Sequence, residues 1–168
     1  MQRSLFGEDP DRGAIFSPCR TWRYQIWNCW DRKLSLLGYI GCNPSVADES
    51  TWDLTAQKFD GFAKRNGFGG WYAANLFGLV STDPEGLAGV EDPVGPGNDE
   101  AIKDVCEKMN RVVICWGAPG GVFHDRVAHV LGVVGELPLW CFGKTKDGYP
   151  RHPSRIPYST KIVLWKEK

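Results

Sequence analysis

The chain has 168 residues, a length that suits a single domain with one hydrophobic core. Hydrophobic residues make up 42% and charged residues 24% of the composition, and no apolar run approaches the ~20 residues that a membrane-crossing helix needs. The net charge is zero, which argues against strong non-specific binding to DNA.

The N-terminal residues and the cysteines indicate the compartment. The start of the chain carries early charges and has no apolar core of signal-peptide length, so we expect a cytoplasmic protein without a membrane partner. The six cysteines lack the regular spacing of a disulfide-stapled domain, and we expect reduced thiols. Because no histidine pairs with a cysteine at zinc-ligand spacing, we expect neither a metal nor another cofactor.

The first half of the chain contains two aromatic-rich or apolar strands and one helix. Residues 21–30 and 34–42 have strand composition, and their short separation predicts an N-terminal β-hairpin. Residues 51–67 carry small and aromatic side chains at helical spacing, with Asp53 near the start and Gly67 as a C-terminal cap.

The second half alternates strands and helices. Residues 71–77 indicate a buried central strand, and residues 98–110, which open with an Asn cap, indicate a helix. A further helix is expected at 121–135, and three more strands are expected at 111–117, 137–143 and 161–165.

This alternation is typical of an α/β domain. We therefore predict a single three-layer domain over residues 1–168, with a largely parallel central sheet flanked by helices. Residues 1–20 are expected to form an irregular N-terminal segment.

Polar residues at the ends of the expected strands are the candidate site residues, because ligands of open α/β sheets bind at the carboxyl ends of strands. Asn43 follows the second strand, where its amide can orient a water or a polar ligand edge, and Pro44 stiffens the turn. The alternative is an ordinary strand-ending turn. Asn75 lies inside an apolar strand, so its amide either meets a ligand or is tied to the neighbouring backbone.

Two later segments offer donors for an anionic group. His152, in a loop flanked by prolines, can donate to a developing oxyanion, or it is simply a surface residue. The Gly-rich turn with Gly117 and Gly120 precedes a helix and offers backbone N–H groups to a phosphate, although it lacks a P-loop signature and a tight turn explains it equally. Asp53 is most simply an acid at a helix start.

The four strand ends together resemble a known superfamily. The order GCNPS, AANLF, ICWG and HPS is similar to that of the uracil-DNA glycosylases, whose motifs are a water-activating Gly-x-(Asp/Asn)-Pro turn, an Asn-bearing strand, a Trp-Gly strand end and a His-Pro-Ser loop. Over nearly its full length, from RYQIWNCW to GYPRHPSRIPY, the chain also resembles a bacterial and phage family known as domain of unknown function 1643.

The glycosylase resemblance implies a role for each candidate residue. Asn43 would hold the attacking water, Asn75 would bind the polar edge of a base, and His152 would bond a base oxygen as the base leaves. Stacking on the base would fall to Trp52 or Phe77. Phosphate contacts would come from Gly117, Gly120, Arg151, Ser154 and Arg155.

The departures from the superfamily bear on function. Ser45 replaces a tyrosine after Pro44, and the loop after His152 lacks the small residues and leucine wedge that accompany base flipping. We favour an enzyme that hydrolyses the N-glycosidic bond of a base, often a modified one, in DNA or in a nucleotide. The alternative is an inactive module that binds a nucleotide or nucleic acid in phage or bacterial DNA modification or defence.

Overall fold

The computed structural model describes residues 11–118 and 123–165, which form one α/β domain around a seven-stranded sheet. The strands are β1 (Arg12–Phe16), β2 (Arg23–Cys29), β3 (Leu36–Gly41), β4 (Gly70–Asn75), β5 (Arg111–Ile114), β6 (Leu139–Cys141) and β7 (Val163–Leu164). The helices are α1 (Leu54–Arg65), α2 (Asn98–Lys108) and α3 (His124–Val134), together with the short 3-10 helices η1 (Pro84–Gly89) and η3 (Pro153–Arg155).

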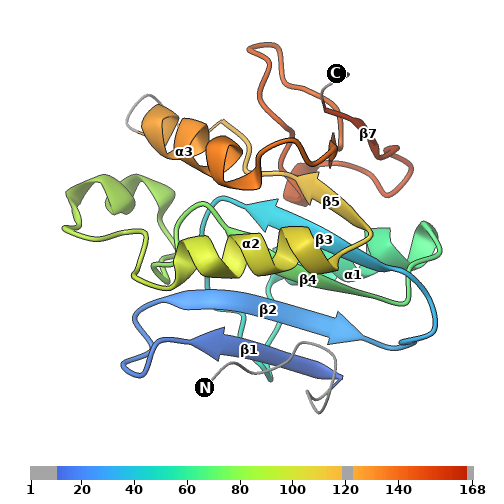
Figure 1. The fold of residues 1–168 in the computed structure, drawn as a ribbon, viewed down its shortest axis with the longest axis horizontal. Coiled ribbons are helices and arrows are strands. Elements are labelled where there is room, and N and C mark those ends of the chain that lie inside the picture. Colours follow the sequence, from blue (N-terminus) through green and yellow to red (C-terminus); the bar gives the residue numbers. More distant parts are fainter. Residues whose placement is uncertain (1–10, 119–122, 166–168) are drawn as a thin grey trace.

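The sheet is mixed and has the strand order β1-β2-β4-β3-β5-β6-β7 (Figure 1). Its central strands β4, β3, β5 and β6 are parallel, as expected, but β2 runs antiparallel to its neighbours β1 and β4, and β7 runs antiparallel to β6. The prediction of a largely parallel sheet therefore holds only for the centre.

The predicted hairpin of β2 with β3 is wrong, because β4 lies between these strands. Ala73 of β4 pairs with Ile26 of β2 in antiparallel fashion and with Tyr39 of β3 in parallel fashion. The N-terminal hairpin is instead formed by β1 and β2, so residues 12–16 belong to the sheet and not to an irregular segment.

The helices match the predicted segments, with two differences at the caps: Asn66 and not Gly67 is the C-cap residue of α1, and the cap of α2 also differs. Asp53 caps α1 as expected, its side chain accepting a hydrogen bond from the N–H of Ala56. Asn98 does not cap α2; Gly97 is the cap residue, and the Asn98 side chain instead reaches the end of β4. In the described part of the chain, none of the helices combines the length and apolar character that crossing a bilayer requires.

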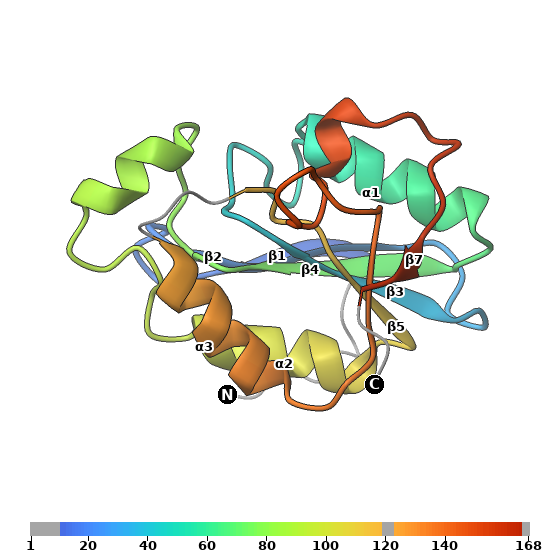
Figure 2. The same ribbon diagram turned by 90° about the horizontal axis from the view of Figure 1, so that it is seen from above.

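The sheet is covered on both faces, which completes the expected three layers. Helix α1 and the segment with η3 lie on one face, and α2 and α3 lie on the other (Figure 2). Tyr39, Phe59 and Trp71 belong to the core beneath α1, whereas Ile40 and Ile102 belong to the core beneath α2. Successive residues of β3 thus point to opposite cores, which is the period of a strand buried on both faces.

All six cysteines are free thiols, which confirms the expectation from their spacing. Cys115 is fully buried, and burial raises its pKa far above the ordinary value for a thiol. Burial also raises the pKa of Cys42 to about 11, so this cysteine at the end of β3 is a packing residue and not a nucleophile at neutral pH.

Candidate functional site

Three of the predicted residues, Asn43, Asn75 and His152, line one cavity of about 150 Å³. The cavity lies on the α1 side of the sheet, beyond the carboxyl ends of β3 and β4. Parallel strands end at the same edge of a sheet, so residues far apart in the sequence are brought together there.

Asn75 presents an amide without a partner to this cavity. The residue ends β4 and is only 7% exposed, yet its side chain makes no hydrogen bond with any described residue. A Cβ built on Gly41 of the neighbouring strand would lie 2.6 Å from Asn75 Oδ1, so only glycine leaves room for the amide. The amide therefore offers the cavity both a donor and an acceptor that no described residue uses, which makes Asn75 the first candidate to bind the polar edge of a ligand.

His152 is held in one tautomer by its own loop. Its Nδ1 accepts a hydrogen bond from the Ser154 N–H at 3.3 Å and lies 2.8 Å from the Ser154 hydroxyl oxygen. Because Nδ1 accepts, the neutral ring carries its proton on Nε2, which has no partner among the described residues. Burial lowers the pKa of His152; nearby Asp53 opposes this shift and Arg155 adds to it. The site therefore contains a neutral donor at pH 7.

Asn43 is partly committed to its own loop. Its Nδ2 donates to the carbonyl oxygens of Pro44 at 3.0 Å and Ser81 at 2.8 Å. Both amide hydrogens are thereby used, and only Oδ1 remains to accept a hydrogen bond from a ligand or a water.

Asp53 is a cavity residue that the sequence indicated only as a helix-start acid. Its Oδ1 accepts from the Ala56 N–H at 2.8 Å, and its Oδ2 accepts from the Ser45 hydroxyl. The side chain thus caps α1 and lines the cavity at once. The helix cap fixes the only carboxylate of the cavity lining in place.

Phe59 and Arg23 are cavity residues that sequence reasoning missed. Phe59 of α1 is buried and stacks on Tyr39, with ring centroids 4.0 Å apart. Arg23 reaches the cavity because of a β-bulge: Ile15 pairs with Gln25, but Phe16 pairs with Arg23. The extra residue, Tyr24, shifts the alternation of β2, so that Arg23 shares the α1 face with Ile26.

The other predicted residues lie outside the cavity lining; these are Trp52, Phe77, Gly117, Arg151, Ser154 and Arg155. Trp52 packs edge-on against Trp71, and Phe77 packs against Phe123 in the core on the α2 side. Neither aromatic ring faces the cavity that Asn75 lines.

The predicted phosphate contacts are used differently. The Gly117 N–H donates to the Pro150 carbonyl at 3.0 Å and is not free for a ligand. A Cβ on Gly117 would lie 3.5 Å from the His152 Cβ, so this glycine packs against the histidine. Ser154 holds His152 as described above. Gly120 lies outside the described residues.

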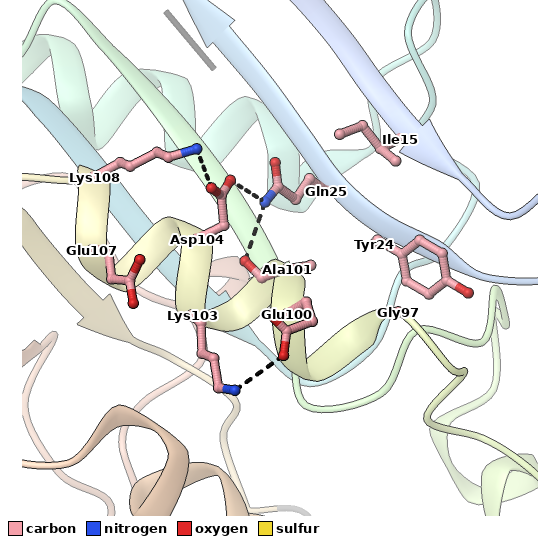
Figure 3. Close-up of a pocket in the computed structure, with 10 residues that line it drawn as sticks. All are labelled: Ile15, Tyr24, Gln25, Gly97, Glu100, Ala101, Lys103, Asp104, Glu107 and Lys108. Carbon is pink, nitrogen blue, oxygen red and sulfur yellow. Dashed lines mark hydrogen bonds and ion pairs between the residues drawn. The ribbon is translucent and has the colours of Figure 1, made fainter. Parts of the chain in front are cut away.

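A larger cavity of about 520 Å³ lies on the α2 side of the sheet (Figure 3). Most of its polar groups bind one another: Gln25 Nε2 donates to the Ala101 carbonyl and to Asp104, and Lys108 pairs with Asp104, although Gln25 Oε1 is buried without a partner. This cavity lies away from the carboxyl ends of the parallel strands, so we assign the candidate site to the smaller cavity. Among the described residues, no cluster of three His, Cys, Asp or Glu side chains is arranged to hold a metal ion.

The contact of Gly41 with Asn75 gives a prediction about stability. Gly41→Ala should lower the free energy of unfolding by about 1–3 kcal/mol, because the new Cβ overlaps Asn75 Oδ1. In an Asn75→Ala background the same change should cost at least about 1 kcal/mol less, since the clashing atom is gone. Urea denaturation of the four proteins measures this coupling, and additive effects would contradict it.

Gly132→Ala is the matched control. Gly132 lies in α3 with open space around it, so this change should raise the free energy of unfolding by about 0.5–1 kcal/mol through helix propensity.

Comparison with known proteins assigns the chain to a family without a known activity. No curated protein and no solved structure matches it. A family model does match, over residues 23–154, a span that includes every residue of the cavity lining from Arg23 to His152. The chain belongs to the family described as a protein of unknown function, DUF1643.

Proposed function

We propose that the cavity binds a nucleobase and that the protein hydrolyses the N-glycosidic bond of a base in a nucleotide or in DNA. The observation that carries this proposal is the Asn75 amide, which has no partner among the described residues, in a cavity that His152 and Asp53 also line. A cavity of about 150 Å³ is large enough for a six-membered ring. An amide offers a donor and an acceptor to the edge of such a ring.

The lining residues supply what this reaction needs. The C–N bond breaks with its electron pair moving to the base, and His152 Nε2–H donates to a base oxygen as that charge builds. The water oxygen bonds to the sugar carbon while its proton passes to the Asp53 carboxylate, which also stabilises the cation-like sugar. Asp53 therefore takes the basic role that the amide of Asn43 cannot perform.

A panel of normal and modified nucleosides, nucleotides and oligonucleotides tests the proposal, with free base as the product measured. We expect release from at least one substrate, and Asp53→Asn should slow it by about 10²–10⁴-fold. Asp147→Asn is the matched control, because Asp147 is exposed and does not line the cavity. The hydrolase proposal is wrong if no member of the panel yields free base.

A second candidate is a module that binds a nucleotide or nucleic acid without cleaving it. The hydrogen bonds from Asn43 to Pro44 and Ser81 favour it, because they make this side chain a brace for its loop. A ligand at 100 times its dissociation constant stabilises the native state by ~2.7 kcal/mol, which a thermal-shift screen detects. Stabilisation by an intact nucleotide without release of base would support the module.

The lowered pKa of His152 predicts a pH dependence of stability. Below its ordinary pKa of 6.5 the unfolded chain takes up a proton at this residue, while the native state stays neutral until the pH reaches its lower native pKa. The free energy of unfolding should therefore fall as the pH drops through this window. His152→Gln keeps a donor near the Nε2 position and should reduce the slope in urea denaturation between about pH 8 and pH 5. An unchanged slope would contradict the assigned environment.

A further inference from the structure

Arg23 is a buried cation whose charge has no direct partner. The residue is 6% exposed, and its Nη1 donates to the Ala47 carbonyl. Its Nε is buried without a hydrogen bond, and neither Nε nor Nη2 makes a hydrogen bond or ion pair with any described residue. These two N–H groups form one edge of the guanidinium plane; Nε is enclosed, and Nη2 is the donor of this edge that is open to an oxyanion.

The carboxylates near Arg23 do not neutralise it by contact. Asp53 and Asp48 act on it only through space, and the oxygens of Asp53 already accept from Ala56 and Ser45. Burial, opposed by these two acids, lowers the pKa of Arg23 to about 10, a value that leaves the group charged at pH 7. A buried charge without a paired counter-ion is costly, so an anion that reaches the guanidinium is strongly favoured.

The first turn of α1 adds partial positive charge on the same side of the cavity as Arg23. Thr55 and Ala56, in the first turn of this 12-residue helix, line the cavity beside Arg23. The N-terminal end of a helix carries partial positive charge, and Asp53 uses the Ala56 N–H but leaves that of Thr55 without a partner among the described residues. The cavity is thus electropositive on the side away from the Asp53 oxygens.

We infer that Arg23, with the N-terminal turn of α1, forms a subsite for an oxyanion of the ligand, a carboxylate or a phosphate. The inference deepens the proposed function, since it specifies that the bound ring or its sugar carries an anionic group inside the cavity. The same chemistry has two sources: a carboxylate on the ring itself, or a phosphate attached to the nucleoside.

Calorimetric titration of the full chain with four probes separates these sources. Orotate is a pyrimidine with a carboxylate, orotamide and uracil are neutral rings of related shape, and inorganic phosphate is an oxyanion without a ring. We expect orotate or phosphate to bind, with orotate at least about 10-fold tighter than orotamide if the ring carries the anion. Binding of phosphate without any preference for orotate over orotamide assigns the subsite to a nucleotide phosphate.

Two variants locate the anion. Arg23→Gln should remove the binding of phosphate and the preference for orotate, while Arg23→Lys should keep part of both, because a point charge replaces the guanidinium. Since Arg23 also holds the Ala47 carbonyl, urea denaturation of each variant checks that it folds. The comparison of orotate with orotamide needs only the unaltered protein and stands if a variant does not fold.

The outcomes for the subsite and for the proposed function are distinguishable. If neither anion binds, or if Arg23→Gln binds them as tightly as the unaltered protein, the subsite is wrong, even where free base is released. Anion binding that depends on Arg23, with no release of base from any substrate, supports the subsite and contradicts the hydrolase.

Discussion

Replacing Asn75 by leucine should make the protein more stable and remove its ability to bind a base. Leucine has a similar shape, and it replaces the side chain of a residue that is 7% exposed and makes no side-chain hydrogen bond with the described part of the chain. Eliminating an unsatisfied buried group should raise the free energy of unfolding by about 1–2 kcal/mol. Affinity for the best base of the panel should fall by about 10²-fold or more, because two polar atoms of the ligand lose their partners.

Asn75→Asp is the matched control for shape. It keeps the volume but replaces the amide donor by a carboxylate oxygen, so it should also lose the ligand while placing a charge beside Gly41. Urea denaturation and calorimetric titration measure the two effects. A less stable Asn75→Leu that binds the base normally would show that the amide serves the fold and not a ligand.

Replacing Asn98 by alanine should give the largest loss of stability among the substitutions considered. Asn98 is fully buried, and its Nδ2 donates to the carbonyl oxygens of Asn75 at 2.9 Å and Leu76 at 3.1 Å. In the variant the Leu76 carbonyl oxygen keeps a second donor, Arg126 Nε at 2.6 Å. Among the described groups, however, only the Asn98 side chain links the Asn75 carbonyl oxygen to the chain that follows β4. We expect the free energy of unfolding to fall by about 2–4 kcal/mol.

Asn66→Ala is the comparison for this substitution. Asn66 also donates its amide to a backbone carbonyl, that of Phe62, but at an exposed helix end. Its loss should lower the free energy of unfolding by about 0.5–1 kcal/mol. Equal effects of the two alanines in urea denaturation would mean that Asn98 does not hold the end of β4.

The local elements were predictable from the sequence, whereas the long-range pairings were not. The spacing of Phe59 and Phe62 and the acid at Asp53 define α1 within a few residues, since these signals act over one or two turns. The pairing of β2 with β4 joins residues such as Ile26 and Ala73, and nothing local to either strand specifies it. Proximity along the chain favoured the hairpin of β2 with β3, which does not form.

The candidate site was partly predictable from polar residues that contrast with their surroundings. Asn75 was identified as an amide in an apolar strand, and His152 as a histidine between prolines, in the loop beyond β6. Asp53 was given only its cap role, since an acid at a helix start already has a sufficient explanation. Arg23 was missed because a single extra residue in β2 reverses its face, and alternation alone places it on the α2 side.

The position of β4 between β2 and β3 has a consequence for the order in which the molecule folds. Until Gly70–Asn75 is available, the β1–β2 hairpin has no strand that connects it to β3, and Arg23 has no fixed position relative to Asn43. Such non-local pairing is slow because the intervening loop must close before the contacts form. We therefore expect the cavity to form late in folding, so that a ligand bound there slows unfolding and leaves the folding rate nearly unchanged.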